Sequence, residues 1–559
     1  MITLTRSQRW LLASIPLLFL GIFFLYPISA IFRISLFPQG HFDAESLRVL
    51  WQKPYYLQVI WFTFWQAGLS TLGALVLGLP AALVFARFQI PGKKLLRALV
   101  TLPFVMPTVV VAAAFIALIG PHGLLNRILM AMLELTEPPI QLMHTIWIIL
   151  LAHVFYNTSV IIRIVGGFWA NMDPRQEAAA AMLGATPWQR LRFITLPLLA
   201  PAILAASLLV FLFNFTSFGV ILILGGPGFA TVEVEIYRTA VRLFNLPVAA
   251  ALSIVQMLFT LAIMATYTRL QQRMSAPQEF QSARQNQRPP RSWTEKLLVL
   301  GVFLALSIFL LAPLAALVLQ SFTLTGAGWA HYQALFINRT NSIFFVTPIE
   351  AVRNSLLFAL VTILFSVGIA LPAAYLLSDA QSKKLALSRI FDPLFMLPMG
   401  TSAVTLGLGY IVALNRPPLN LRTSLVIVPI AHTIIAFPFV LRAILPVLRG
   451  MNPHLREAAR LLGASSWRVL RYIDLPLLRR SLLVGIVFAF TISMGEFSAS
   501  LLVTRPQFPT LPVAIYRLLG QPGASNFGQA LALSVILMLV TAIGYIVIEN
   551  LRYGGIEEF

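Results

Sequence analysis

Residues that could carry out chemistry are few in this chain, and they lack the spacing of a catalytic or metal site. The 559 residues include 19 Asp and Glu, seven His and no Cys, which excludes disulfides, thiolate ligands and thiol nucleophiles. The His residues form no H-E-x-x-H pattern, and there is no G-x-x-x-x-G-K-S/T loop for nucleotide phosphates. We therefore expect no catalytic residue, no metal site and no cofactor on this chain, and predict that it is not an enzyme.

Polar side chains inside apolar stretches are the next candidates for function. Glu496 lies in such a stretch, where a carboxylate costs several kcal/mol unless it is paired or faces water. It is predicted to point inward from within a span, either as a hydrogen-bonded structural tie or as an electrostatic aid to a cationic solute. With Ser217, Asn157 and Met494 it makes up the predicted substrate path.

A polar segment at residues 173–186 has the pattern of a short surface helix. Asp173 is a good N-cap, Pro174 suits the first helical position, and Gly184 supplies a left-handed stop. A second short helix is predicted to start at Thr186. Both would lie along the membrane surface.

The same pattern of helix-capping residues recurs at residues 452–465. Asn452 precedes Pro453, Gly463 ends the helix, and a second short helix is predicted after Ser465. Each copy combines small residues, an acidic side chain and a Trp, which suits insertion into a groove on another protein.

The elements that position these residues follow from the composition. The chain is 58% hydrophobic and 11% charged, with a mean hydropathy of +0.85, whereas a soluble protein carries about 25% charged residues. The sequence therefore predicts an all-α integral membrane protein with about twelve transmembrane helices. The predicted spans are residues 11–34, 58–86, 95–119, 145–165, 198–224, 247–267, 297–319, 352–377, 390–414, 423–445, 481–503 and 528–548.

The two halves of the chain are an internal repeat. A shift of 279 residues superposes His153 on His432, Gly184 on Gly463, Trp188 on Trp467, Leu196-Pro197 on Leu475-Pro476, and Tyr237-Arg238 on Tyr516-Arg517. Six spans per half make the repeats parallel, with the pseudo-two-fold axis along the membrane normal. The paired His residues are predicted to be hydrogen-bonded between helices rather than bound to metal.

The basic residues orient the chain. With an inside N-terminus, 28 of the 40 Lys and Arg fall on the inside, which places both termini in the cytoplasm. The net charge of +21 is therefore explained by membrane orientation, and no nucleic-acid partner is expected. The predicted domains are a first repeat at 1–268, a basic cytoplasmic linker at 269–296 and a second repeat at 297–559.

The segment at Glu457-Ala458-Ala459, Gly463, Ile473 and Leu475-Pro476 resembles the motif with which permease subunits of bacterial ATP-binding-cassette (ABC) importers dock their ATPases. The first copy keeps Gly184, Ile194 and Leu196-Pro197, but its Glu177 stands seven residues before the glycine rather than six. About 100° of helix rotation separates the two positions, so a contact of Glu177 with an ATPase is in doubt. The resemblance implies that the ATPase-coupling residues are Glu177, Ala178, Ala179, Gly184, Trp188, Leu196, Pro197, Glu457, Ala458, Ala459, Gly463, Trp467, Leu475 and Pro476.

The whole chain resembles a fused pair of type I importer permease domains, close to the thiamine and ferric-iron permeases. The resemblance implies alternating access in a bacterial inner membrane, with ATP and Mg²⁺ bound by two partner ATPase subunits. It also implies an extracytoplasmic solute-binding protein. The expected cargo is a small cation such as thiamine, with ferric iron as the alternative. A secondary transporter driven by an ion gradient is the rival class, although it has no need of paired docking helices.

Overall fold

The computed structural model describes residues 6–38, 40–90, 92–274, 287–324, 328–337, 346–378, 387–415, 417 and 419–553. Within these ranges the regular secondary structure is helical, and the exception is an isolated bridge between Phe88 and Arg288. Eleven helices are long and apolar enough to cross a membrane, or twelve if one bent pair counts as a span. The predicted all-α membrane fold is confirmed. Residues 275–286 of the predicted linker and both chain ends lie outside the described residues.

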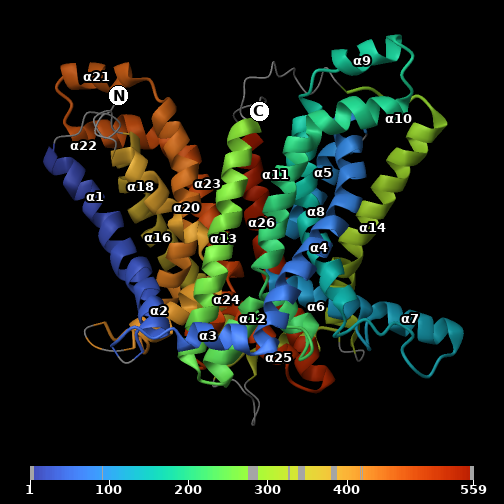
Figure 1. The fold of residues 1–559 in the computed structure, drawn as a ribbon, viewed down its shortest axis with the longest axis horizontal. Helices are drawn as coiled ribbons and strands as arrows, with labels where there is room; N and C mark the ends of the chain where they lie inside the picture. The colour runs from blue at the N-terminus through green and yellow to red at the C-terminus, as the bar shows by residue number, and fades with distance from the viewer. Residues whose placement is uncertain are drawn as a thin grey trace. The chain divides into compact units, whose positions relative to one another are not determined.

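The chain divides into two compact units. Unit 2 contains Trp51–Glu235 and Val255–Gly328. Its helices are α4 (Pro54–Arg87), α5 (Lys93–Val105), α6 (Thr108–Ile119), α7 (Leu124–Leu133), α8 (Ile146–Ala170), α9 (Arg175–Met182), α10 (Pro187–Arg190), α11 (Leu196–Phe215), most of α12 (Val232–Tyr237) and α13 (Leu246–Met274), and α14 (Trp293–Thr323), with π-helical segments η2 (Leu191–Thr195) and η3 (Ile221–Gly225). Within this unit, α9 lies at one end of α4, α8 and α14, and α7 lies at the other end (Figure 1).

Unit 1 contains Met1–Leu50, Ile236–Ile254 and Trp329–Phe559. Its elements are α1 (Arg6–Leu20), η1 (Gly21–Leu25), α2 (Tyr26–Leu36), α3 (Glu45–Gln52), η4 (Arg238–Arg242), α15 (Ala330–Gln333), η6 (Ala334–Phe336), α16 (Glu350–Ser378), α18 (Leu387–Met396), η7 (Leu397–Gly400), α19 (Ala403–Ala413), α20 (Ile427–Gly450), α21 (Pro453–Leu461), α22 (Ser466–Val469), η8 (Leu470–Asp474), α23 (Leu475–Gly495), α24 (Ser498–Val503), α25 (Leu511–Leu519) and α26 (Ala524–Tyr553). The apolar core of this unit lies between α16, α20 and α23, and that of unit 2 lies between α4, α8 and α11.

The first span of each sequence repeat packs in the unit that is built mainly from the other repeat. In unit 1, α1 packs on α16 and α2 packs on α19. Gly409 allows this close approach, because a Cβ at that position would lie 3.0 Å from Cβ of Pro27. The Tyr410 hydroxyl donates to the carbonyl of Phe23 at 2.8 Å. In unit 2, α14 packs on α4, α5 and α6. The compact units therefore arise by exchange of first spans between the repeats.

Two predicted spans are divided near their middle. The span predicted at 95–119 covers α5 and α6, and the break coincides with Pro107, which has no N–H to donate and disfavours a helical Met106. By length and composition the candidate span here is Thr108–Leu133, which joins α6 and α7, so the predicted bounds are wrong. The span predicted at 390–414 bends by 96° between Gly400 and Ala403. At that bend the Ser402 hydroxyl accepts hydrogen bonds from the first free N–H groups of α19.

The spans predicted at 198–224 and 481–503 are also wrong as continuous helices. In unit 2, α11 ends at Phe215 and η3 begins six residues later. In unit 1, α23 ends at Gly495 and α24 begins at Ser498. Glu496 therefore lies in a break between two helices and not within a helix as predicted.

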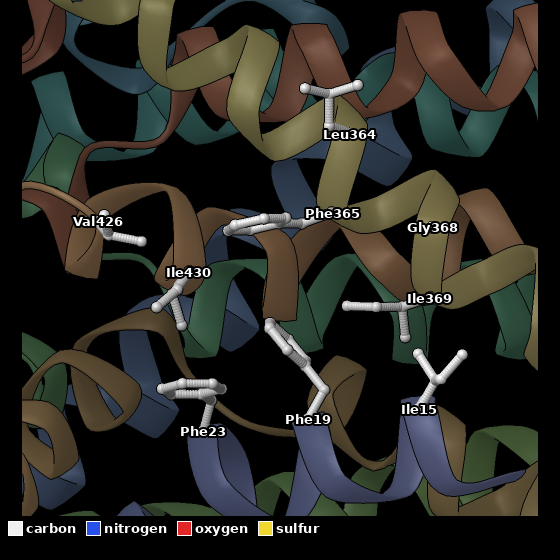
Figure 2. A pocket seen from close by; sticks show the side chains of 9 residues that line it. All are labelled: Ile15, Phe19, Phe23, Leu364, Phe365, Gly368, Ile369, Val426 and Ile430. Atoms are coloured by element: carbon white, nitrogen blue, oxygen red, sulfur yellow. The ribbon is translucent and has the colours of Figure 1, made fainter. Parts of the chain in front are cut away.

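An apolar hollow of about 390 Å³ lies among α1, η1, α16 and the start of α20 in unit 1 (Figure 2). No charged or hydrogen-bonding side chain lines it, so it offers nothing to hold a polar solute. We therefore assign it no role in a substrate path. Its lining residues are Ile15, Phe19, Phe23, Leu364, Phe365, Gly368, Ile369, Val426 and Ile430.

The end of the linker is fixed to the end of α4 in unit 2. The Arg288 N–H donates to the carbonyl of Arg87, and the Gln89 N–H donates to the carbonyl of Arg288, both at 3.0 Å. The Arg288 guanidinium forms an ion pair with Glu295 in the first turn of α14, and this hydrogen bond raises the pKa of Arg288. Arg87, at the same end of α4, also forms an ion pair with the docking helix α9 described next.

Candidate functional site

Each unit carries one candidate docking helix, α9 in unit 2 and α21 in unit 1. The Asp173 carboxylate accepts a hydrogen bond from the Arg175 N–H at 2.9 Å, but the N-cap position of α9 is held by Pro174, so the prediction of Asp173 as the N-cap is wrong by one position. The helix itself begins at Arg175, and the prediction of Pro174 as its first residue is wrong by one position. In α21, the Asn452 side chain accepts from the His454 N–H and Pro453 is the first helical residue, as predicted.

Both docking helices end at a left-handed glycine. The φ angle is +84° at Gly184 and +81° at Gly463, which an L-residue adopts at a cost of roughly 1–2 kcal/mol. The following N–H reaches back to the carbonyl five residues earlier, from Ala185 to Ala180 at 3.0 Å and from Ala464 to Ala459 at 2.9 Å. This pairing is that of a Schellman motif, and the chain leaves it into the helix of the following span.

The tip of each docking helix exposes large apolar side chains. Just before the turn, Met182 is 90% exposed, and its repeat partner Leu461 is 89% exposed. The neighbours Leu183 and Leu462 are exposed to the same degree, and the predicted coupling residues Trp188 and Trp467 are each 64% exposed. Ala178 and Ala458 are exposed as well. Two apolar residues and a Trp displayed in this way form a docking surface of the kind expected for a partner protein.

The second short helix is not a separate surface helix as predicted. In unit 2, α10, η2 and α11 follow one another without a gap, so the helix that begins at Pro187 continues as a span to Phe215. In unit 1, α22, η8 and α23 repeat this from Ser466 to Gly495. The two π-helical segments occupy equivalent positions in the repeat, and such segments often mark functional sites within helices. Leu196-Pro197 and Leu475-Pro476 open the α-helical part that follows.

In unit 1, a buried ion pair ties the docking helix to this span. Arg456 Nε donates to Asp474 Oδ1 at 2.6 Å, and the two side chains are only 8% and 5% exposed. Tyr375, in α16, donates its hydroxyl to the other oxygen of Asp474 at 2.7 Å. We call Arg456, Asp474 and Tyr375 the unit 1 clasp. It joins the docking helix, the π-helical segment and the second span of its repeat.

Unit 2 has an equivalent clasp with different chemistry. Glu177 forms an ion pair with Arg87 at the end of α4 and accepts a hydrogen bond from the Thr195 hydroxyl at 2.5 Å. The Arg87 guanidinium also lies 5.5 Å from the ring centroid of Trp169. We call Glu177, Thr195 and Arg87 the unit 2 clasp. Glu177 is turned into its own unit, with its side chain 13% exposed.

The next position along the docking helix faces away from the clasp. The Glu457 side chain is 59% exposed, and its described partner is His454, which is 81% exposed and lies 3.0 Å away. Ala178 holds the same place in the first copy. Only the second copy therefore offers a carboxylate to a partner at this position, although a role of either residue in coupling remains a prediction.

Glu496 is held by a set of short-range hydrogen bonds in unit 1. Its carboxylate accepts from the N–H groups of Ala499 and Ser500 at 2.9 and 2.8 Å, and from the Ser500 hydroxyl at 2.8 Å. These contacts cap the N-terminus of α24. His432 connects the cap to α20, because its Nε2 lies 3.5 Å from Glu496 and 2.8 Å from Ser500, while its Nδ1 contacts Ser493. These hydrogen bonds to a serine and to backbone groups all lie within unit 1, so they do not tie the two halves together, and both predicted roles of Glu496 stay predictions.

Unit 2 has a related but uncharged cluster around His153. Its Nδ1 lies 2.9 Å from the Ser70 hydroxyl and its Nε2 lies 2.8 Å from the Ser217 hydroxyl. Asn157 donates to the carbonyl of His153 at 3.0 Å and to Asn214 Oδ1 at 2.7 Å. Both histidines therefore form interhelical hydrogen bonds, as predicted. Ser217 and Asn157 fall together in this cluster, whereas Met494 is fully buried beside the break that contains Glu496 in unit 1.

The clasp residues Asp474, Tyr375, Thr195 and Arg87 were not predicted. A signal for part of them is present in the sequence, since the repeat shift of 279 places Glu177 on Arg456 and Thr195 on Asp474, 18 residues apart in both copies. In unit 1 the pair could have been predicted from a basic residue in the docking helix, Arg456, and an acidic residue at the start of the apolar span that follows, Asp474.

Residues 74–276 and 290–552 each match the family described as "Binding-protein-dependent transport system inner membrane component". The thiamine transport system permease protein ThiP of Escherichia coli (strain K12) is 27% identical over 508 residues, which cover 90% of each chain. The probable ABC transporter permease protein y4fN of Sinorhizobium fredii (strain NBRC 101917 / NGR234) is 25% identical over 555 residues, covering 96% of this chain and 95% of the relative. A solved bacterial ABC transporter involved in alginate import is 20% identical, with a TM-score of 0.41, over 48% of this chain and 98% of its own.

The helical fold, the apolar spans and the two matched segments define a multi-pass membrane permease. The chain belongs to the family of binding-protein-dependent transport system inner membrane components, with two copies of the domain fused in one polypeptide. It is a permease subunit of an ABC importer, and the resemblance inferred from the docking motif is confirmed.

Proposed function

We propose that this chain provides the membrane path for thiamine or a closely related small cation, and that two separate ATPase subunits drive its import. The observation that carries the proposal is the pair of docking helices, each with the same exposed apolar tip, in a chain that has no phosphate-binding loop. One tip per ATPase gives an assembly of one permease chain with two ATPase subunits. ATP and Mg²⁺ are bound by those subunits, and this chain binds no cofactor.

The clasps supply the mechanical connection. Each docking helix is tied by charged or hydrogen-bonded side chains to the first turns of the following span and to the second span of its repeat. When the ATPases close on ATP, the docking helices move with them, and the clasps transmit this motion to two spans in each unit. The path between the repeats then opens alternately to either side of the membrane.

The topology follows from the basic residues. The docking helices and both termini lie in the cytoplasm, because most Lys and Arg fall in the corresponding segments. An extracytoplasmic binding protein delivers the solute to the opposite face of an inner membrane. The thiamine permease relatives, matched over about 90% of both chains, support thiamine as the cargo.

Reconstitution of the chain with its ATPase and binding-protein partners in liposomes tests the proposal. Native mass spectrometry should find two ATPases per chain, and uptake of labelled thiamine should require ATP and the binding protein and persist after ionophores collapse ion gradients. One ATPase per chain would contradict the proposed assembly. ATP-independent uptake would favour a secondary transporter, and uptake of ferric iron without thiamine would select the alternative cargo.

A further inference from the structure

The helix α7 of unit 2 is amphipathic and projects away from the bundle. It lies at the end of α4 and α8 opposite α9, runs across their direction and extends beyond α14 (Figure 1). Leu125, Ile128 and Met132 are exposed, and their spacing of three and four residues places them on one helix face. Met132 is the most exposed of the three, at 75%.

The charged residues of this segment lie away from the apolar face. Arg127 is exposed and lies roughly 100° to 160° around the helix from Leu125, Ile128 and Met132, and the exposed Glu134 follows directly after the helix as its C-cap. A helix with an apolar stripe, a charged face and no core to cover the stripe is typical of helices that lie in a membrane interface.

Hydrogen bonds at the start of α7 hold the helix in this orientation. The Asn126 side chain is fully buried and donates to the carbonyls of Gly120 and Ile140 at 2.9 and 2.8 Å, while its oxygen accepts from the Ile140 N–H at 2.9 Å. Glu134 ends the helix in a left-handed conformation with φ of 51°. The segment that follows the helix is therefore hydrogen-bonded at Ile140 to the first turn of α7. The fold itself thus sets the orientation of the exposed apolar residues.

The segment that carries α7 is connected through α6 to a membrane span. α7 packs on α6, which packs on α14, and α14 exposes Leu304, Ile308 and Leu319 along a membrane span. We propose that α7 is an interfacial anchor, which inserts its Leu125, Ile128 and Met132 face into the headgroup and acyl boundary of the bilayer. The leaflet is the one opposite the docking helix of unit 2. Such an anchor holds this end of the unit at the membrane surface while the docking end moves.

Single-cysteine labelling tests the anchor, because the chain has no Cys of its own. Leu125→Cys and Met132→Cys report on the apolar stripe, and Arg127→Cys and Glu134→Cys are matched controls away from it. Each variant of the full chain is labelled with a polarity-sensitive fluorophore and reconstituted in phospholipid vesicles, without binding protein or ATPase. We expect blue-shifted emission, several-fold stronger quenching by doxyl-labelled lipids and weak quenching by aqueous iodide at positions 125 and 132, with the reverse at 127 and 134.

Two results would overturn the proposal. Equal access of iodide to all four positions would show that the stripe stays in water. Emission at positions 125 and 132 that shifts only after the solute-binding protein is added would assign the stripe to that protein instead. Neither result depends on which solute is transported, so a failure of the anchor and a failure of the proposed cargo are distinguishable.

Discussion

Seven residues before its turn glycine, the docking helix of unit 1 has Arg456 and that of unit 2 has Glu177. Both side chains turn inward, and both bind the residue 18 positions later, at the end of the π-helical segment. In unit 1 this partner is the buried carboxylate of Asp474, whereas in unit 2 it is the hydroxyl of Thr195, and the countercharge comes from Arg87.

The two clasps use equivalent positions of the repeat but different residue types. A connection between the docking helix and the following span is present in both copies, while the sign of its charge is reversed. The connection therefore matters more than the individual side chains. The two clasps also differ in burial, because the pair in unit 1 is nearly inaccessible whereas Arg87 in unit 2 is 38% exposed. Removal of one partner should therefore cost more in unit 1.

The largest effect is expected for Asp474→Ala. This change leaves the Arg456 guanidinium buried without its countercharge, which destabilises by about 3–5 kcal/mol. The thermal stability of the purified chain should fall, together with ATPase co-purification. The matched change Thr195→Ala in unit 2 keeps the ion pair of Glu177 with Arg87 and removes only one hydrogen bond, worth about 1 kcal/mol. Equal losses in the two variants would contradict the difference in burial.

The turn glycines should behave alike where the clasps differ. A Cβ at Gly184 or Gly463 meets no atom within 4 Å, so Gly184→Ala and Gly463→Ala lose only the left-handed backbone preference, roughly 1–2 kcal/mol each. We expect both variants to weaken ATPase binding to the same extent, measured by titration of labelled ATPase. Gly167→Ala is the control, since that glycine also has open space but lacks a positive φ. A loss confined to one docking helix would show that the two turns are not equivalent.

A smaller effect is expected at the exposed position. Glu457→Gln removes a carboxylate that is 59% exposed, so ATPase affinity should fall by about 1 kcal/mol, or roughly fivefold, at that docking helix. Ala178→Glu introduces the missing carboxylate in the first copy and should raise affinity there by a similar factor. Stability should not change in either variant. A loss of thermal stability in Glu457→Gln would place this residue in the fold rather than at the interface.

The sequence was sufficient to predict the helical membrane fold, the repeat and both left-handed turns, because each of these depends on local residues. Gly184 and Gly463 end their helices through their own backbone freedom. The breaks after Phe215 and Gly495 were not predicted, since the apolar character continues across them. Only the carboxylate of Glu496 signals one of them, and its partners Ser500 and His432 are assembled by tertiary packing. The exchange of first spans also depends on packing between distant segments.

The smallest effect should come from the transfer of the unit 1 clasp into unit 2. Glu177→Arg alone places a second positive charge beside Arg87 and has no acid to bind, so it should destabilise the docking helix clearly. Addition of Thr195→Asp supplies the acid at the position that Asp474 occupies in the other copy. The double variant should recover most of the stability, to within about 1 kcal/mol of the natural chain, since repulsion from the partly exposed Arg87 is screened by solvent. A double-mutant cycle on thermal stability and ATPase-coupled uptake measures the coupling energy. If the two changes are simply additive, positions 177 and 195 are not a clasp, and the docking helix is connected to its span by the helical backbone alone.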